Sequence, residues 1–283
     1  MTISVPGDNS SQELVFKVVD DSPLYLTYLP PKKKVFDKAP VFLVISGGGW
    51  LTQSREAILD GYKISCDLLR ENGICVVSAD YRVVSLFPSV DAGDEVGDVL
   101  DAITYLCNNA EVLEIDPERI VLSGHSAGGH IIALIAYASP GLFPTAYDVP
   151  KVRYAGCVPF AAPCILSLSE SWPKEKQNEF IHLFPNSIYD DNLASRWSPY
   201  NYISKHSTPT LFIHGDSDTV VPVSNSLRSF EKGCQHGADF TMICPENGGH
   251  CLEPIDTEKT VIPSYDVVQY KIVEWVCEKL GAI

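Results

Sequence analysis

The segment Gly124–Gly128 reads Gly-His-Ser-Ala-Gly and lies between two apolar runs. The run before it, Ile120–Leu122, is typical of a buried strand, and the run after it, Ile131–Ala136, is typical of a helix. Glycines at both ends allow the backbone to turn sharply, because they have no Cβ atom to clash. The pattern predicts a strand–turn–helix unit that lifts the Ser126 hydroxyl out of the sheet, which is the arrangement of a nucleophile elbow.

Strand-like and helix-like runs alternate along most of the chain. The strand-like runs are the eight segments 14–19, 24–29, 41–46, 74–79, 120–123, 154–160, 210–214 and 239–244. From the third run onward helix-like segments lie between the strands, and the clearest cover 57–71, 96–106, 227–232 and 268–280. This alternation predicts a single α/β domain over 1–283, with a mostly parallel eight-stranded sheet and helices on both faces. The first two runs have no helix between them and are expected to form an antiparallel edge.

The alternation breaks between Phe160 and Thr210. This stretch contains five prolines, two tryptophans and a polar helix-like piece at Lys174–His182. A loop this long inside a compact domain usually has a function of its own, such as covering a binding site. We therefore expect a short cap, inserted at about 164–197, over the site that contains Ser126.

Composition narrows the classes of partner and cofactor. The net charge of −15 repels nucleic acid and anionic membranes, so neither is an expected partner. The simpler explanation of this charge is that it keeps the protein soluble. The nine cysteines include no C-x-x-C pair, which argues against a metal site and a disulfide framework. The N-terminus has no signal-peptide pattern and no apolar stretch is long enough to span a bilayer, so a cytoplasmic location is expected. Oligomeric state cannot be inferred from these features.

A serine hydroxyl becomes a useful nucleophile only when a base accepts its proton and a third group orients that base. Two strand-like runs downstream of Ser126 lead into segments with candidates for these two groups. The first leads into 214–218, which contains two aspartates, and the second leads into Pro245–His250. The carboxyl ends of parallel strands meet at the edge of the sheet where ligands bind. His250, after a Gly-Gly turn, is the predicted base, and the acid is Asp216 or Asp218, with position slightly favouring Asp218.

Two other histidines, His130 and His214, are interpreted as structural. His130 lies one turn into the helix that follows the elbow, where packing or capping is the simpler role. His214 ends a strand-like run, where its ring is expected to satisfy local backbone groups.

A run of three glycines, in the segment Ser46–Trp50, follows the strand-like run Val41–Ile45. Bare backbone at these positions lets consecutive N–H groups point at a developing oxyanion, and the N–H of Ala127 at the start of the elbow helix adds a further donor. A glycine run after a strand can instead bind phosphate. That alternative requires G-x-G-x-x-G or G-K-[ST] spacing, and neither pattern is present here.

These motifs together resemble the α/β-hydrolase superfamily over nearly the whole chain. The closest resemblance is to the esterase group that includes hormone-sensitive-lipase-like carboxylesterases and bacterial acetyl or feruloyl esterases. It is carried by Gly-Gly-Gly-Trp at 47–50, Asp-Tyr-Arg at 80–82, Pro-Glu-Arg-Ile at 117–120, Gly-His-Ser-Ala-Gly-Gly-His at 124–130 and His-Gly-Asp-Ser-Asp-Thr-Val-Val-Pro at 214–222. The resemblance implies that Asp218 is the triad acid and that Gly48, Gly49 and Ala127 are the oxyanion donors.

Two positions depart from the pattern of this group. Ser46 stands where the oxyanion motif usually opens with histidine, a residue that braces the loop, so the loop is expected to be either looser here or braced by other partners. His125 stands where elbows of the hormone-sensitive-lipase type usually have aspartate. This second departure makes the feruloyl or acetyl esterase branch, or the kynurenine formamidase branch, look nearer.

The predicted function is hydrolysis of small-molecule carboxylic esters by a serine enzyme through an acyl-enzyme, with no cofactor and no metal. Candidate substrate-binding residues are Trp50 and Trp197, whose bulk would narrow the site, and His125 beside the serine. A narrow site favours short acyl groups, acetyl to butyryl, or small aromatic acyl groups. One alternative is an aryl formamidase or amidase that uses the same triad. The other is a catalytically silent binding protein that keeps the fold.

Overall fold

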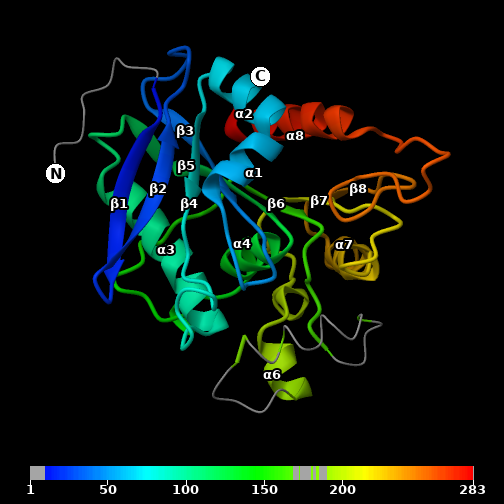
Figure 1. The fold of residues 1–283 in the computed structure, drawn as a ribbon. Helices are drawn as coiled ribbons and strands as arrows, with labels where there is room; N and C mark the ends of the chain where they lie inside the picture. Colours follow the sequence, from blue (N-terminus) through cyan, green and yellow to red (C-terminus); the bar gives the residue numbers. More distant parts are fainter. Residues whose placement is uncertain (1–9, 168–171, 173–179, 181–182, 185–189, 283) are drawn as a thin grey trace.

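The computed structural model describes residues 10–167, 172, 180, 183–184 and 190–282. These residues contain one eight-stranded sheet (Figure 1). The strand order is β1-β2-β4-β3-β5-β6-β7-β8. The strands are β1 (Gln12–Val19), β2 (Ser22–Leu29), β3 (Ala39–Ile45), β4 (Cys75–Ala79), β5 (Ile115–His125), β6 (Gly156–Phe160), β7 (Thr210–Ile213) and β8 (Phe240–Ile243). β2 pairs antiparallel with β1 and with β4, and the remaining pairs are parallel. The predicted mostly parallel sheet with an antiparallel edge is confirmed.

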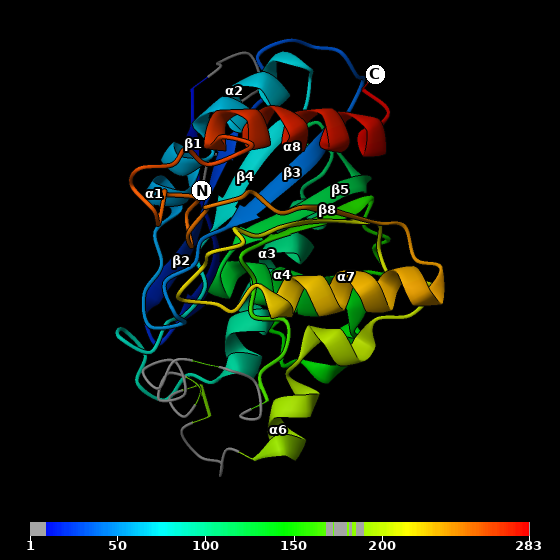
Figure 2. The same ribbon diagram turned by 90° about the vertical axis from the view of Figure 1, so that its right-hand side faces the viewer.

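Helices cover both faces of this sheet (Figure 2). The α-helices with described bounds are α1 (Arg55–Gly61), α2 (Lys63–Glu71), α3 (Ala92–Asn108), α4 (Ala127–Tyr137), α6 (Asp191–Arg196), α7 (Ser224–His236) and α8 (Tyr265–Leu280), and two short 3₁₀ turns are η1 (Pro140–Leu142) and η2 (Pro199–Tyr202). Strand β3 has apolar side chains on both faces of the sheet. Val41, Leu43 and Ile45 pack into the core under α3 and α4, whereas Phe42 and Val44 pack into the core under α1, α2 and α8.

The prediction of a single helix over 57–71 is wrong, because the structure divides this segment at Tyr62 into α1 and α2. In a continuous helix the Ser65 N–H would donate to the Gly61 carbonyl. Here the Gln269 side chain of α8 takes both groups: its Oε1 accepts from the Ser65 N–H at 3.0 Å, and its Nε2 donates to the Gly61 carbonyl at 3.0 Å. The Tyr265 hydroxyl also donates to Gly61, at 2.7 Å. The break therefore follows from contacts with a helix 204 residues away along the chain.

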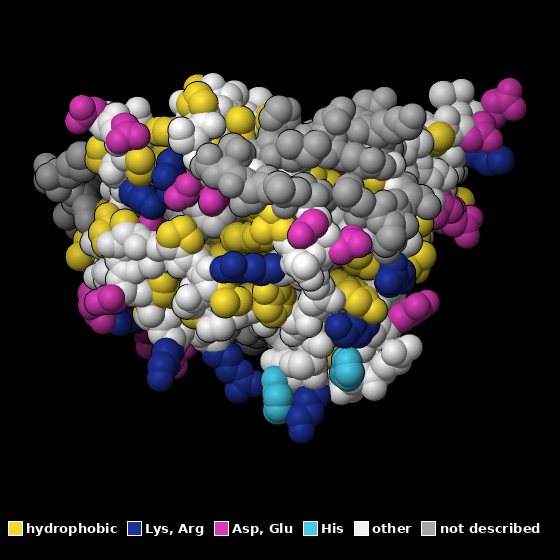
Figure 3. Space-filling model, turned by 90° about the horizontal axis from the view of Figure 1, so that it is seen from below, with side chains coloured by type: hydrophobic (Ala, Val, Ile, Leu, Met, Phe, Trp, Pro, Cys, Tyr) yellow, Lys and Arg dark blue, Asp and Glu magenta, His cyan; other side chains and the backbone are white. Residues whose placement is uncertain are grey.

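The region of the predicted cap, 164–197, is only partly covered by the described residues. The polar piece expected at 174–182 lies outside them except for Phe180, so the cap remains a prediction. Within the described part, α6 lies below the sheet in the view of Figure 1, and the side chains of Trp172 and Trp197 are buried. Seen from below, the surface mixes acidic, basic and hydrophobic side chains, and the acidic groups are dispersed over this face (Figure 3).

Candidate active site

Ser126 lies between the end of β5 and the start of α4, as the motif predicts. Its backbone adopts φ 54° and ψ −121°, a conformation that costs a non-glycine residue on the order of 1–3 kcal/mol. The flanking glycines permit the tight approach behind this strain. A Cβ atom on Gly124 would lie 2.5 Å from the Gly128 backbone, and one on Gly128 would lie 2.3 Å from the Ile45 carbonyl oxygen. The turn thus holds Ser126 in a fixed, strained position at the carboxyl edge of the sheet.

The candidate acid and base meet at this edge. His250 Nδ1 lies 2.8 Å from Asp218 Oδ2, and the other carboxylate oxygen accepts from the backbone N–H groups of Val220 and Val221 at 2.7 and 3.0 Å. Asp216, the alternative from the sequence, is exposed and accepts a hydrogen bond from the Ser217 hydroxyl. Of the two aspartates, the structure pairs Asp218 with His250.

Asp218 is held in its charged form. Its side chain is 0% exposed, and burial alone would raise the pKa of the carboxyl group. Hydrogen bonds from His214 and His250 outweigh burial, so the pKa of Asp218 lies well below its usual value. Because the carboxylate only accepts hydrogen bonds, His250 carries its proton on Nδ1 and leaves Nε2 free to accept one.

His214 contributes more to this site than the sequence analysis assigned to it. Its Nε2 lies 3.0 Å from the Val221 carbonyl oxygen and 3.1 Å from Asp218 Oδ2, while the Ser226 hydroxyl lies 2.8 Å from Nδ1. Both groups near Nε2 are acceptors, so Nε2 carries the proton and the Ser226 hydroxyl donates to Nδ1. The expected contact with a backbone carbonyl is present, but the contact with Asp218 was missed. Its signal in the sequence is the four-residue spacing from His214 to Asp218.

The glycine run after β3 passes directly beside the elbow. A Cβ atom on Gly47 would lie 2.8 Å from Ser126 Cβ and 2.7 Å from the His125 carbonyl oxygen. Gly48 and Gly49 follow with φ +132° and +62°, which a residue with a Cβ atom rarely adopts. Gly47 was not among the predicted oxyanion donors, but it is the glycine of this run that packs against Ser126. Gly48, Gly49 and Ala127 remain predicted oxyanion donors.

Ser46, in the place of the usual histidine, is braced from two sides. Its hydroxyl accepts a hydrogen bond from the Ser54 N–H at 3.1 Å, and its carbonyl oxygen accepts one from the Tyr81 hydroxyl at 3.0 Å. Ser54 is in turn the N-cap of α1, where its hydroxyl accepts from the Ala57 N–H. The oxyanion loop is thus tied to the first turn of α1 and to the segment after β4.

Trp50 and Trp197 are joined through His130. The Trp50 indole N–H donates to His130 Nδ1 at 3.3 Å, and His130 Nε2 donates to the Trp197 carbonyl oxygen at 2.8 Å. The side chains of Trp50 and Trp197 are only 3% and 7% exposed. This burial favours a packing role for both tryptophans over contact with substrate, and it agrees with the structural role expected for His130.

Truncating either tryptophan to alanine is therefore expected to cost stability. Removal of a buried Trp typically costs about 3–5 kcal/mol, and the loss of Trp50 would also leave His130 Nδ1 without its donor. The preference among acyl chain lengths should change little. Urea unfolding and kcat/KM for acetate and octanoate esters test this. Unchanged stability together with a shifted preference would assign the tryptophan to the substrate pocket.

His130 also gives the protein a pH-dependent stability. Burial lowers its pKa from 6.5 to about 4, whereas in the unfolded chain the imidazole titrates near its ordinary value of about 6.5. Between these values the unfolded state binds more protons, so stability falls as the pH drops from about 6.5 towards 4. We expect a smaller decrease for His130→Gln when the free energy of unfolding is measured by urea denaturation across this range. Equal decreases would contradict the prediction.

His125 links the elbow to the loop that carries the candidate base. Its Nε2 donates to the backbone carbonyl of His250 at 3.0 Å, and the two ring centroids are 4.7 Å apart. The His125 and Phe160 rings also pack in an edge-to-face arrangement. Burial, and then the neighbouring His250, lower the pKa of His125 to about 4, so its ring is neutral at neutral pH.

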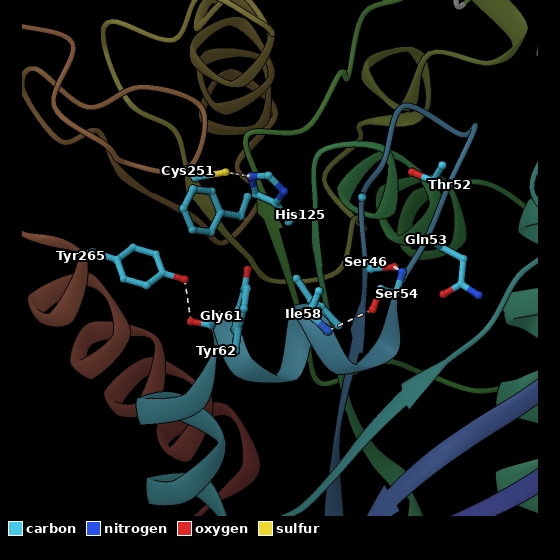
Figure 4. A pocket seen from close by; sticks show the side chains of 13 residues that line it. Ser46, Thr52, Gln53, Ser54, Ile58, Gly61, Tyr62, His125, Cys251 and Tyr265 are labelled. Atoms are coloured by element: carbon cyan, nitrogen blue, oxygen red, sulfur yellow. Dashed lines mark hydrogen bonds between the residues drawn. The ribbon is translucent and has the colours of Figure 1, made fainter.

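A cavity of about 550 Å³ opens beside the elbow, between α1 and the start of α8 (Figure 4). Its volume falls within the roughly 300–1,000 Å³ that is typical of small-molecule sites. It is lined by Ser46, Gly47, Thr52, Gln53, Ser54, Ala57, Ile58, Gly61, Tyr62, His125, Phe160, Cys251 and Tyr265. None of these side chains carries a charge at neutral pH. Of the three predicted substrate-binding residues, His125 is the one that lines this cavity.

Comparison with known proteins identifies the family. The BD-FAE family model matches residues 27–232, which is well over half of the chain. The chain belongs to the BD-FAE family. Esterase LipQ of Mycobacterium tuberculosis is 26% identical over 222 residues, which cover 76% of this chain and 51% of LipQ. Ethyl acetate hydrolase of Pseudomonas putida is 27% identical over 202 residues, which cover 68% of this chain and 59% of the hydrolase.

Solved structures of esterases have a similar fold. Thermogutta terrifontis Est2, an esterase solved with propionate bound and with butyrate bound, is 25% identical in both cases, with TM-scores of 0.75 and 0.72. The matches cover 95% of this chain and 94% and 92% of the two Est2 chains. The resemblance to esterases of the α/β-hydrolase superfamily is thereby confirmed. This chain spans about half the length of the first curated relatives it matches.

Metal-binding clusters and membrane-spanning helices are both absent from the described residues. Within these residues, no group of three or more His, Cys, Asp or Glu side chains is arranged to hold a metal ion. No helix in the same part of the chain is long and apolar enough to cross a membrane.

Proposed function

We propose that this BD-FAE family member is a serine hydrolase of small carboxylic esters, in which Ser126 is the nucleophile, His250 the base and Asp218 the acid. The observation that carries the proposal is the 2.8 Å contact between His250 Nδ1 and Asp218 Oδ2, beside a serine held in the strained conformation of an elbow. His125, adjacent to Ser126, donates to the His250 backbone and so ties the base to the nucleophile. The esterases among its relatives support the same activity.

The chemistry follows from these contacts in two steps. In the first, Ser126 Oγ attacks the carbonyl carbon of the ester and gives its proton to His250 Nε2, and Asp218 stabilises the imidazolium. The bond to the alcohol oxygen then breaks as His250 passes that oxygen its proton, which leaves an acyl-enzyme. In the second step water attacks the acyl carbon, His250 accepts the proton from water and returns it to Ser126, and the carboxylic acid departs.

The negative oxygen that forms in each step needs hydrogen-bond donors. The backbone N–H groups of Gly48, Gly49 and Ala127 are the proposed donors, because the glycine loop passes beside Ser126 at Gly47 and Ala127 opens α4. Each such donor is typically worth about 3–4 kcal/mol in the transition state. The hydrogen bonds to Ser46 keep the loop in place before substrate binds.

Short acyl groups, acetyl to butyryl, are the proposed acyl specificity, with small aromatic acyl groups included. The propionate and butyrate bound to Est2 support this range. Each accommodated methylene normally adds about 0.8 kcal/mol of binding free energy, so a site that fits longer chains would give kcat/KM values that rise steadily with length. We expect kcat/KM for 4-nitrophenyl esters to peak at or before butyrate. A series that rises to octanoate would refute this specificity.

The same panel, extended by feruloyl esters and an aryl formamide, tests the reaction type. Faster turnover of the formamide than of every ester would make the chain a formamidase with the same triad. No turnover of any substrate by the folded protein would favour the silent binding protein.

A further inference from the structure

We propose that the cavity between α1 and α8 binds the alcohol part of the ester, and that this alcohol is ring-sized, largely apolar and free of negative charge. The inference rests on the proposed ester hydrolysis, since it assigns one half of the substrate to one side of Ser126. The position of the cavity, the chemistry of its walls and the charge of the protein support this assignment.

The position of the cavity relative to the base decides which half of the ester it holds. The alcohol oxygen must receive its proton from His250, so the alcohol leaves on the side of Ser126 that faces this histidine. Cys251, which follows His250 directly, lines the cavity, and so does His125, which donates to the His250 carbonyl. Gly47 completes the connection, because it lines the cavity and packs so closely on the elbow that a Cβ atom on it would lie 2.8 Å from Ser126 Cβ. Ser126 and His250 are not among the lining residues, but the neighbours of both are, so the cavity lies beside the place where the departing alcohol must lie.

The walls of the cavity are mostly apolar or already hydrogen-bonded, apart from Gln53 Oε1 and the Tyr62 hydroxyl, which are buried and have no hydrogen-bond partner among the described residues. Ile58, Tyr62 and Phe160 provide aliphatic and aromatic surface. The Tyr265 hydroxyl is engaged with the Gly61 carbonyl, as the dashed line in Figure 4 shows. Such walls favour a ring or a branched apolar group over a sugar, whose many hydroxyl groups would lose their water without enough partners.

The cavity offers no compensation to an anionic alcohol. None of the lining residues is a lysine or an arginine, and His125 is neutral there because burial lowers its pKa to about 4. The net charge of −15 adds long-range repulsion. A carboxylate on the alcohol would therefore lose its hydration without gaining a partner.

Filling the mouth of the cavity tests its role. Ala57 is exposed on α1 and lines the cavity, so Ala57→Trp places bulk there without disturbing the core. We expect kcat/KM for 2-naphthyl acetate to fall at least tenfold, while kcat/KM for ethyl acetate changes little. Asp60→Trp is the matched control, because Asp60 is exposed on the same helix but is not one of the lining residues. This control should leave both values near those of the wild type.

The acyl-enzyme separates the two halves of the substrate. All acetate esters give the same acetyl-enzyme, so its hydrolysis cannot depend on the alcohol. Ala57→Trp should slow the pre-steady-state burst with 2-naphthyl acetate and leave the hydrolysis rate of the acetyl-enzyme unchanged. If the variant instead alters the ratio of acetate to butyrate turnover with one common alcohol, the cavity holds the acyl group. If no ratio changes, the cavity lies outside the substrate path. Both results overturn the assignment.

A second pair of substrates tests the charge. 4-Acetoxybenzoate and its methyl ester have the same ring and the same acetyl group, and they differ in one negative charge. We expect at least tenfold higher kcat/KM for hydrolysis of the acetyl group in the methyl ester, at an ionic strength high enough to screen long-range repulsion. Equal values would contradict an uncharged alcohol site. Failure of the wild-type protein to hydrolyse any acetate would instead refute the proposed function, so the two failures are distinguishable.

Discussion

Replacing Ser126 by alanine is expected to lower kcat by roughly 10⁶-fold, the effect typical of removing the nucleophile from a serine triad. The reason is that no acyl-enzyme can form without the hydroxyl, although the base and the oxyanion donors stay in place. Stability should change by less than about 0.5 kcal/mol, because alanine keeps the Cβ atom and takes the same strained backbone. Steady-state hydrolysis of 4-nitrophenyl acetate and urea unfolding measure the two quantities.

The strain at Ser126 supplies a control for this variant. Ser126→Gly also removes the hydroxyl, but glycine adopts φ 54° readily. It should be as inactive as the alanine variant. Glycine makes the unfolded chain more flexible, which lowers the free energy of unfolding, and relief of the backbone strain should offset at least part of this loss. Residual activity of either variant above about one per cent of wild type would show that another group attacks the ester.

Asp218→Asn is expected to lower kcat by roughly 10⁴-fold, the size of effect seen when the imidazole of a triad loses its orienting anion. An amide can donate as well as accept a hydrogen bond, so it no longer fixes the proton of His250 on Nδ1. The carboxylate has a pKa well below its usual value, so it is ionised at neutral pH, where kcat is to be measured.

Asp216→Asn is the matched control, because Asp216 is two residues away and exposed. It should retain nearly all activity. Since Asp218 also accepts hydrogen bonds from His214 and from two backbone N–H groups, circular dichroism at the assay temperature must show that the asparagine variant is folded. Loss of activity in Asp216→Asn with retention in Asp218→Asn would reverse the assignment of the acid.

The elbow could be predicted from the sequence because all of its determinants are local. The two glycines, the serine and the apolar runs on either side lie within about twenty residues, and each favours the same turn. The parallel sheet was likewise predictable, since central strands such as β3 are apolar along their whole length and are buried on both faces.

Features that depend on contacts distant in sequence were not predictable in this way. The break at Tyr62 depends on Gln269, a polar residue on α8 that replaces one helical hydrogen bond by two of its own. Within the candidate site, position alone favoured Asp218 over Asp216 only slightly, because both follow the same strand. The contact of His214 with Asp218 and of Gly47 with Ser126 depends on how the loops fold back. A pattern along the chain carries little information about such packing.

Mass spectrometry of the protein treated with a fluorophosphonate tests the central claim most directly, since this reagent forms a stable bond to an activated serine. We predict one adduct per chain, on the peptide that contains Ser126, formed in step with the loss of esterase activity. Asp218→Asn should form it far more slowly, and Asp216→Asn should form it at the wild-type rate. An adduct on another residue, or full loss of activity with Ser126 unmodified, would contradict the proposal that Ser126 is the nucleophile.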